Sequence, residues 1–434
     1  MSVTVIVWVA LYLLAIVGAL ANPLFGLFGY LLEYFQRPDL YWWGKPLPNF
    51  RWNFIIGAVA TAAYFLHRGT LQPFQRHTMV PLVLLILQAV NTSIVGFWAV
   101  SPEMNLKWSI QYWKLVVTFM LFSEIVRTRR SLDLVILFQI VGAAWWGWDG
   151  LDAKREQTRL EGVGSGDTLN SNLLAAHLLT IIPLGVLFAI TKRPTWMRAA
   201  AILGTPLILN LVVLANSRGA TLGLLASGAS SLFLVRRELR KRVVLLGFAG
   251  LFALWVIADP QFIARQQSTV SADDHSAASR LELWGGALQL IKDYPLGTGA
   301  RGFHRLSPQY VPTIQVDKDD GEGRSAHNTY LQIAAEFGLQ GLALFVAFIC
   351  YTFKLLQCVR RERASVDWPY YASLGLQLGL IGTLTAAFFS NRFFGESTYW
   401  ICGLSLALYR MTSPAEAAAT TDTPANGRLP RVAA

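Results

Sequence analysis

Repeated apolar runs, each close to the length that crosses a bilayer, dominate this sequence. Hydrophobic residues make up 54% of the 434 and charged residues only 15%, whereas a soluble protein of this size carries about 25% charged residues. A helix of about 20 residues crosses the hydrocarbon core of a bilayer, which is about 30 Å thick. Such runs must be helical in lipid, because each backbone polar group needs a partner within its own segment. The sequence therefore predicts an all-α, polytopic membrane protein.

We count 12 or 13 such runs, because the first two form either one bent span or a tight pair. They lie near residues 3–20, 23–35, 53–67, 78–99, 108–126, 132–148, 170–190, 199–215, 219–234, 243–258, 330–353, 370–389 and 397–409. The first run lacks a basic leader and an obvious cleavage site, so we expect a retained helix. Cys350, Cys358 and Cys402 fall in or near apolar runs, which favours small core residues over a disulfide framework.

Basic residues cluster on alternate connections between these runs. The clusters are "RTRR" (127–130), "TKRPTWMR" (191–198), "RRELRKR" (236–242) and "KLLQCVRRER" (354–363). Lys and Arg concentrate in short cytoplasmic loops, so these connections are predicted to be cytoplasmic. The same distribution accounts for the net charge of +11 without a nucleic-acid partner.

The remaining connections are then predicted to lie outside, including roughly 149–169 and 390–396. The predicted organisation is 1–258 as N-terminal transmembrane helices, 259–329 as an outer catalytic loop, 330–410 as C-terminal transmembrane helices and 411–434 as a cytoplasmic tail. The polar composition of that tail predicts disorder. The loop 259–329, of about 70 residues, is far longer than an ordinary connection and is the expected functional segment.

Within this loop, "SAASRLELWGGALQLIKDYP" (276–295) predicts an amphipathic helix. Ser279 and Glu282 form a capping-box pattern, and Pro295 would end the helix. Leu281, Trp284, Leu288 and Ile291 recur at helical spacing. Arg280 would lie in the first turn, where the helix dipole disfavours a cation. Arg280 is therefore either an ordinary surface charge or a residue held there for an anion.

Two further motifs in the loop suggest ligands that we reject. "PLGTGARGF" (295–303) contains G-x-G-x-x-G, but that motif binds dinucleotides only between a strand and a helix. It is expected instead to be a turn whose backbone can approach a ligand closely. "DKDD" (317–320) resembles a metal cluster but has no further ligands at suitable spacing, so we expect no metal.

Three cationic or imidazole groups are candidates for chemistry. Arg218 in "NSRGA" (216–220) separates two apolar runs, and such an Arg is functional by default unless it snorkels to the interface. His327 in "RSAHN" (324–328) is either a capping residue or a base near neutral pH. His177 is expected to be an internal hydrogen-bonding residue. Guanidinium groups bind phosphate oxygens bidentately, so Arg218, Arg280 and His327 suit a lipid-linked pyrophosphate.

The segment 279–341 strongly resembles the core signature of the O-antigen ligase and O-antigen polymerase superfamily. The resemblance is carried by R-x-x-x-W, P-x-G-x-G and H-N-x-Y-x-Q-x-x-x-E-x-G in one chain. "NSRGA" and the many-helix layout extend it over most of the sequence.

This resemblance implies a GT-C type glycosyltransferase of the bacterial inner membrane with about 12 spans and a periplasmic active site. It implies inverting transfer of glycan from undecaprenyl pyrophosphate to lipid A–core, with no metal or other cofactor. The expected partners are this donor, this acceptor and membrane lipids. By position, Arg218 and Arg280 would hold the donor pyrophosphate, His327 would act as base and Asn328 would position the acceptor. Arg301 and Arg324 are further candidates for substrate binding.

The acceptor stays open at this point, because O-antigen polymerases and protein O-oligosaccharyltransferases share the signature. A lipid or polysaccharide transporter is an alternative from another class. It would be expected to show charged residues at mid-membrane and repeated halves, and the sequence shows neither.

Overall fold

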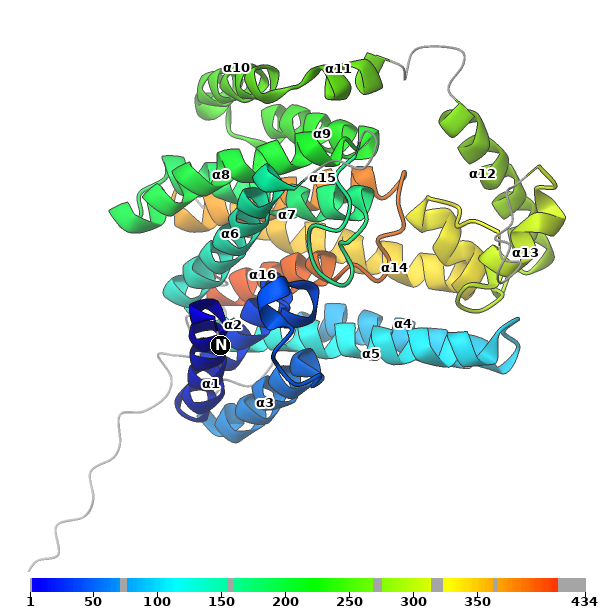
Figure 1. Cartoon of the computed structure of the whole chain (residues 1–434), viewed down its shortest axis with the longest axis horizontal. Coiled ribbons are helices and arrows are strands. Elements are labelled where there is room, and N and C mark those ends of the chain that lie inside the picture. The colour runs from blue at the N-terminus through cyan, green and yellow to red at the C-terminus, as the bar shows by residue number, and fades with distance from the viewer. Residues whose placement is uncertain are drawn as a thin grey trace, which may run out of the picture.

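The computed structural model describes residues 2–70, 76–153, 159–267, 275–313, 323–361 and 366–412. In this part of the chain, all regular secondary structure longer than one residue is helical (Figure 1). The helices that match the apolar runs are α1 Val3–Ala21, α2 Pro23–Phe35, α3 Trp52–His67, α4 Val80–Ile94, α5 Pro102–Ile125, α6 Arg129–Asp152, α7 Ser171–Ile190, α8 Thr195–Ala215, α9 Arg218–Leu234, α10 Arg240–Ile257, α14 Thr329–Arg361, α15 Trp368–Ala386 and α16 Glu396–Thr412. Each predicted run is thus a helix.

The other helices are shorter or belong to the long loop. The loop contains α11 Pro260–Gln267, α12 His275–Asp293 and α13 Gly302–Tyr310. Short 3-10 helices are η1 Pro38–Leu40, η2 Trp42–Gly44, η3 Arg68–Thr70, η4 Arg76–Met79, η5 Val95–Phe97 and η6 Arg237–Leu239. The predicted acidic run 317–320 and the tail beyond Thr412 lie outside the described residues.

Several helices have the length and composition of membrane spans. Among the described residues six qualify, namely α1, Val80–Phe97, α6, α7, α8 and α14, and α10 with α11 forms a seventh candidate bent by 112°. The chain is therefore a multi-pass membrane protein. The larger number of about 12 spans remains a prediction, since α2, α3, α9 and α16 have only 13, 16, 17 and 17 residues.

The first two apolar runs form a tight pair rather than one bent span. Asn22 has extended backbone and its side chain accepts a hydrogen bond from the N–H of Leu24, 3.0 Å away. Asn22 therefore caps α2, and Pro23 occupies the first helical position, where its missing N–H is harmless. The two helices pack closely, because a Cβ added at Gly18 would lie 2.7 Å from the Phe25 ring.

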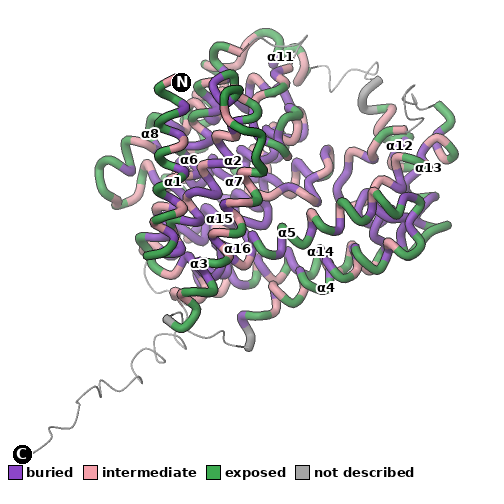
Figure 2. The backbone as a smooth tube through the Cα atoms, turned by 60° about the horizontal axis from the view of Figure 1, so that its bottom comes forward, coloured by how far each residue is buried: buried purple, intermediate pink, exposed green. Residues whose placement is uncertain are grey.

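Buried residues concentrate along α7, α15 and α16, as Figure 2 shows. Backbones approach closely here: a Cβ at Gly223 of α9 would lie 2.4 Å from the Gly382 oxygen of α15, and one at Gly379 would lie 2.6 Å from the Thr180 oxygen of α7. Small residues at such crossings are typical of helices that associate in membranes. By contrast, α10 has no buried residue and lies along the upper edge in Figure 1.

Polar contacts divide the connections into two groups. In one group, Glu124 pairs with Arg127 and Arg410, and Asp133 pairs with Arg193; these residues come from the basic connections and the end of α16. In the other group, the loops 159–170 and 387–395 contact each other, while α12 and α13 lie together at the right-hand end in Figure 1. The polar residues considered next belong to this second group.

Candidate active site

His327 lies in the short segment that leads into α14, and its backbone is unusual. Its φ is 48°, in the left-handed region that non-glycine residues rarely adopt. The neighbouring Asn328 is buried, and its side-chain oxygen accepts hydrogen bonds from the N–H groups of Tyr330 at 3.0 Å and Leu331 at 3.1 Å. Asn328 therefore caps α14, which commits its oxygen to the helix end.

The residues on either side of His327 are held by three different elements. The N–H of Ala326 donates to Gln332 Oε1 at 2.8 Å, and the Ala326 carbonyl accepts from Trp284 Nε1 of α12 at 2.9 Å. Thr329 donates its N–H to the Ala387 carbonyl at 2.8 Å and its hydroxyl to the Ser390 carbonyl at 2.7 Å. Helices α12 and α14 and the α15–α16 connection thus fix the segment together.

The imidazole of His327 sits in a cationic environment. Burial, together with the positive charges of Arg280 and Arg324 and the nearby His304, lowers its pKa to about 4. The structure therefore places His327 near Arg280 and Arg324, whereas Arg218, the third group of the predicted trio, bonds to the α11 segment described below. A histidine with this pKa is neutral near pH 7 and has a free lone pair for a proton.

His304 is a member of this cluster that sequence reasoning missed. It belongs to α13, and its Nδ1 lies 3.5 Å from Oε1 of Glu336, a buried residue of α14. The same Glu336 oxygen accepts a hydrogen bond of 2.6 Å from Gln332 Nε2. Only the tertiary packing of α13 on α14 brings His304 here, so no sequence pattern pointed to it.

The structure corrects two features predicted for the helix that carries Arg280. Helix α12 already includes His275, so Ser279 is not its cap and Arg280 lies in the second turn, beyond the strongest dipole effect. The predicted apolar face is wrong at Leu281 and Leu288, which are 65% and 52% exposed, whereas Ile291 is buried as predicted. The residues that α12 buries are Leu283, Ala287, Leu290 and Ile291.

Arg218 is the first residue of α9 and lies where α11 docks. Its Nε donates to the Arg265 carbonyl at 3.0 Å, and Arg265 Nε donates to the Asn216 carbonyl at 3.1 Å. Asn216 is left-handed, with φ 49°, which permits the abrupt turn from α8 into α9. Ser217 caps α9 and also donates to Asn172 Oδ1 at 2.9 Å. Arg218 is thus half-buried at a junction of four segments.

The glycine-rich turn packs closely against the backbone of α14. Gly297 has φ 92°, and a Cβ there would lie 2.5 Å from the Gly338 nitrogen. The N–H groups of Thr298 and Gly299 donate to the Ala335 and Glu336 carbonyls at 3.1 and 2.8 Å. These contacts coincide with a break in α14 at Gly338, whose φ is 78°. Arg301 follows the turn with φ 61° and is half-buried at the start of α13.

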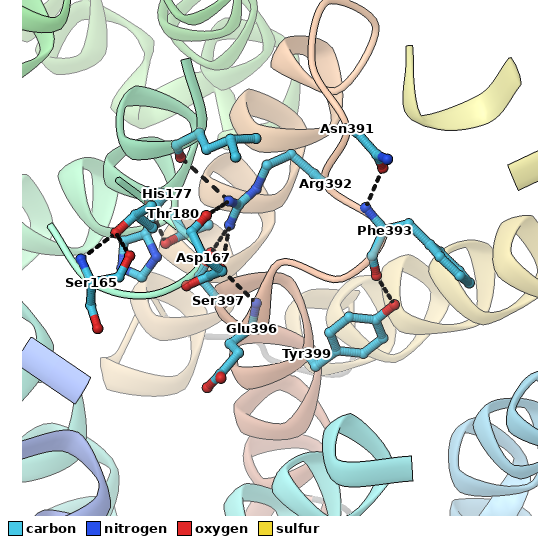
Figure 3. Close-up of polar contacts among 12 residues, drawn as sticks. Ser165, Asp167, His177, Thr180, Asn391, Arg392, Phe393, Glu396, Ser397 and Tyr399 are labelled. Carbon is cyan, nitrogen blue, oxygen red and sulfur yellow. Dashed lines mark hydrogen bonds and ion pairs between the residues drawn. The ribbon is translucent and has the colours of Figure 1, made fainter. Parts of the chain in front are cut away.

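A second polar cluster, which sequence reasoning did not single out, lies between the loops 159–170 and 387–395 (Figure 3). Arg392 is 3% exposed; its guanidinium lies 3.6 Å from Asp167 Oδ2 and donates to Ser397 Oγ at 3.0 Å. Asp167 also accepts from the Tyr34 hydroxyl at 2.5 Å and the Glu396 N–H at 3.1 Å. Arg218 was a functional candidate because an Arg between two apolar runs is costly to place in a membrane. The same reasoning applies to Arg392.

This cluster connects to His327 and contains His177. The backbone N–H of Arg392 donates to the Thr329 hydroxyl at 2.8 Å, two residues from His327. The Tyr34 hydroxyl lies 3.2 Å from His177 Nδ1, an internal hydrogen bond of the kind predicted for His177. The cluster therefore anchors the connection that holds the start of α14.

Metal ligands are not gathered in the part of the chain that the structure describes. Those residues include no group of three or more His, Cys, Asp or Glu side chains arranged to hold an ion. The groups that the structure places around His327 are guanidinium, imidazole, amide and carboxylate side chains.

These observations define the class: an all-helical, multi-pass membrane protein with a basic, imidazole-containing site at one end of its bundle. A family model described as O-antigen ligase matches residues 203–346, which confirms the resemblance to the O-antigen ligase and polymerase superfamily. The matched range includes Arg218, Arg280 and His327.

An uncharacterized protein of Haemophilus influenzae strain KW20 is similar over a shorter range. The two are 28% identical over 152 residues, which cover 31% of this chain and 38% of that protein. The chain thus aligns with well under two thirds of this relative's length.

Proposed function

We propose that the protein is an O-antigen ligase, which transfers glycan from undecaprenyl pyrophosphate to lipid A–core at the periplasmic face of the bacterial inner membrane. The observation that carries the proposal is the neutral, half-buried imidazole of His327 beside Arg280 and Arg324. A base next to guanidinium groups suits a reaction in which a hydroxyl loses a proton while a pyrophosphate leaves.

In the proposed reaction a hydroxyl oxygen of the acceptor sugar attacks the anomeric carbon of the donor. His327 takes the hydroxyl proton as the new carbon–oxygen bond forms. The bond from the anomeric carbon to the phosphate oxygen breaks, and undecaprenyl pyrophosphate leaves with the bonding electrons. A single displacement of this kind inverts the anomeric centre. No step requires a metal ion.

The arginines divide the binding tasks in this proposal. Arg280 and Arg218 bind the pyrophosphate oxygens, and Arg324 and Arg301 extend the cationic surface toward the substrates. Asn328 contributes by capping α14, which fixes the helix that follows the base. Residues 259–329 form the periplasmic segment of a GT-C type bundle, which is consistent with the two separate groups of connections.

A reconstituted transfer assay tests the proposal. Purified protein in liposomes is given lipid-linked glycan with lipid A–core, with a repeat-unit acceptor or with a pilin-like peptide. Transfer to lipid A–core is expected. Transfer only to the repeat unit or only to the peptide would make the protein a polymerase or a protein O-oligosaccharyltransferase, and no transfer to any acceptor would overturn the assignment as a glycosyltransferase.

Variants in the same assay separate the base from the binding groups. His327→Ala is expected to lower transfer by about 10²–10⁴-fold while donor binding survives. Arg280→Lys keeps the charge but loses the planar fork, so both donor binding and transfer should fall. Arg198→Lys, at an exposed arginine of α8, is the matched control. Loss of donor binding in His327→Ala as severe as in Arg280→Lys would show that His327 is not the base.

A further inference from the structure

The peptide group that precedes His327 is hydrogen-bonded from outside its own segment. Ala326 is fully buried, its N–H donates to Gln332 Oε1 and its carbonyl accepts from Trp284 Nε1. The Ala326 carbonyl and the His327 N–H share one planar unit, so the bond from Trp284 also orients the nitrogen of His327. The Asn328 cap and the Thr329 contacts fix the chain on the other side. The backbone of His327 is therefore determined from both directions.

This determination matters because the backbone of His327 is strained. A non-glycine residue with φ 48° is less favourable than one in an ordinary conformation and persists only where its surroundings enforce it. Without those hydrogen bonds the residue would relax, and its imidazole would leave the position beside Arg280.

A carboxylate sets the orientation of the Gln332 amide. The amide oxygen of Gln332 faces the Ala326 N–H, so the NH₂ group of the same amide must find an acceptor on the other side. That acceptor is Glu336 Oε1, at 2.6 Å. Asn328, Gln332 and Glu336 recur every four residues, which places them along one face of α14.

We infer that Trp284 and Gln332, the latter oriented by Glu336, are positioning residues that hold His327 in its left-handed conformation for transfer. The inference rests on the proposed function of His327 as base. It also gives a physical role to Trp284, Gln332 and Glu336. These residues belong to the same motifs as Arg280 and His327, R-x-x-x-W and H-N-x-Y-x-Q-x-x-x-E-x-G.

Two variants test the inference independently. Trp284→Phe keeps an aromatic ring next to Phe389, whose centroid is 6.3 Å away, but removes the N–H donor. Gln332→Met keeps the length of the side chain but removes the acceptor for Ala326. Trp113→Phe is the matched control, because Trp113 Nε1 donates at 3.3 Å to Ser93 on the exposed surface.

Both variants are expected to lower kcat by about 10–100-fold, since a shift of about 1 Å in a catalytic group can have an effect of that size. The KM for the donor should stay within about twofold of the wild-type value. Arg280 and Arg218, which bind the donor in the proposed function, are unchanged in both variants. The control should keep wild-type kcat. Unchanged kcat in both variants, or an equal loss in Trp113→Phe, would overturn the inference.

An NMR titration of His327 provides a readout that needs no substrate. The groups facing its imidazole are Arg280 from α12, His304 from α13 and Arg324 from its own segment, and none of them is altered in the variants. Loosening the segment should expose the imidazole, so its pKa should rise from about 4 toward the ordinary 6.5. A pKa that stays at the wild-type value in both variants would overturn the inference. Absence of transfer by the wild-type protein would instead count against the proposed function.

Discussion

Replacing Asp167 with Asn should destabilise the protein strongly although it changes a single atom. Asp167 accepts hydrogen bonds from the Tyr34 hydroxyl and the Glu396 N–H, and it is the ion-pair partner of Arg392. An asparagine has one acceptor oxygen, so its NH₂ group would face either the Glu396 N–H, as a donor–donor contact, or the Tyr34 hydroxyl, which would then have to accept instead of donate. The substitution therefore removes a charge and disrupts at least one of the existing hydrogen bonds.

The size of the effect follows from burial. A hydrogen bond to a charged group contributes about 1.5–3 kcal/mol, and breaking a buried ion pair costs about 3–5 kcal/mol. Arg392 is almost fully buried, but the side chain of Asp167 is 21% exposed and the pair is 3.6 Å long, which reduces the second contribution. We expect Asp167→Asn to lower the free energy of unfolding by about 3 kcal/mol.

Thermal unfolding in detergent, followed by tryptophan fluorescence, measures this effect. Asp39→Asn is the matched control, because Asp39 pairs with Arg37 at 2.8 Å while the two side chains are 48% and 38% exposed. Such an exposed pair contributes about 0–1 kcal/mol. Asp167→Asn should lower the Tm by several degrees and Asp39→Asn hardly at all. Equal shifts in Tm for the two variants would refute the argument that the Asp167 cluster stabilises the loops 159–170 and 387–395.

Four other predictions concern activity and topology. The transfer rate should be nearly constant from about pH 6 to pH 8 and fall below about pH 5. The reason is that His327, with a pKa of about 4, must be unprotonated to accept a proton. A transfer rate that rises on acidification would contradict this. Gly297→Ala should reduce transfer and expose the 295–300 turn to protease, whereas Gly228→Ala, where a Cβ meets nothing within 4 Å, should do neither. EDTA should leave transfer intact, and a loss reversed by Mg²⁺ would show a metal requirement. On a cysteine-free background, Thr313→Cys should react with reagents added from the periplasm and Thr195→Cys only from the cytoplasm; the reverse pattern would invert the proposed topology.

The helical architecture was predictable because lipid leaves few alternatives to a helix for an apolar run. The predicted run 330–353 matches α14, which begins at Thr329 directly after the polar "RSAHN" stretch. The break at Gly338 was not predictable, since a single glycine is compatible with a continuous helix. It depends on contact with the turn around Gly297, about 40 residues earlier in the chain.

The sequence singled out Arg280 and His327 because charge is rare in so apolar a chain, and the structure places them near each other. His304 contributes through its contact with Glu336, which no local spacing encodes. Arg392 could have been singled out by its place between two apolar runs, but its pairing with Asp167 is a tertiary contact. The exposed apolar residues of α12 misled the assignment of its buried face, because amphipathic spacing does not tell which neighbour a helix will meet.

The contacts of Thr329 have a consequence for the order in which a working enzyme is made. Its hydroxyl is held by Ser390, 61 residues later in the chain, and the Arg392 N–H completes the same bond network. During translation the histidine segment therefore leaves the ribosome well before the connection that secures it. A nascent chain that ends before residue 387 would carry every residue proposed to touch substrate, together with Trp284 and Gln332, but it would lack the contacts that hold Thr329. Full activity should thus appear only after the connection 387–395 has been synthesised.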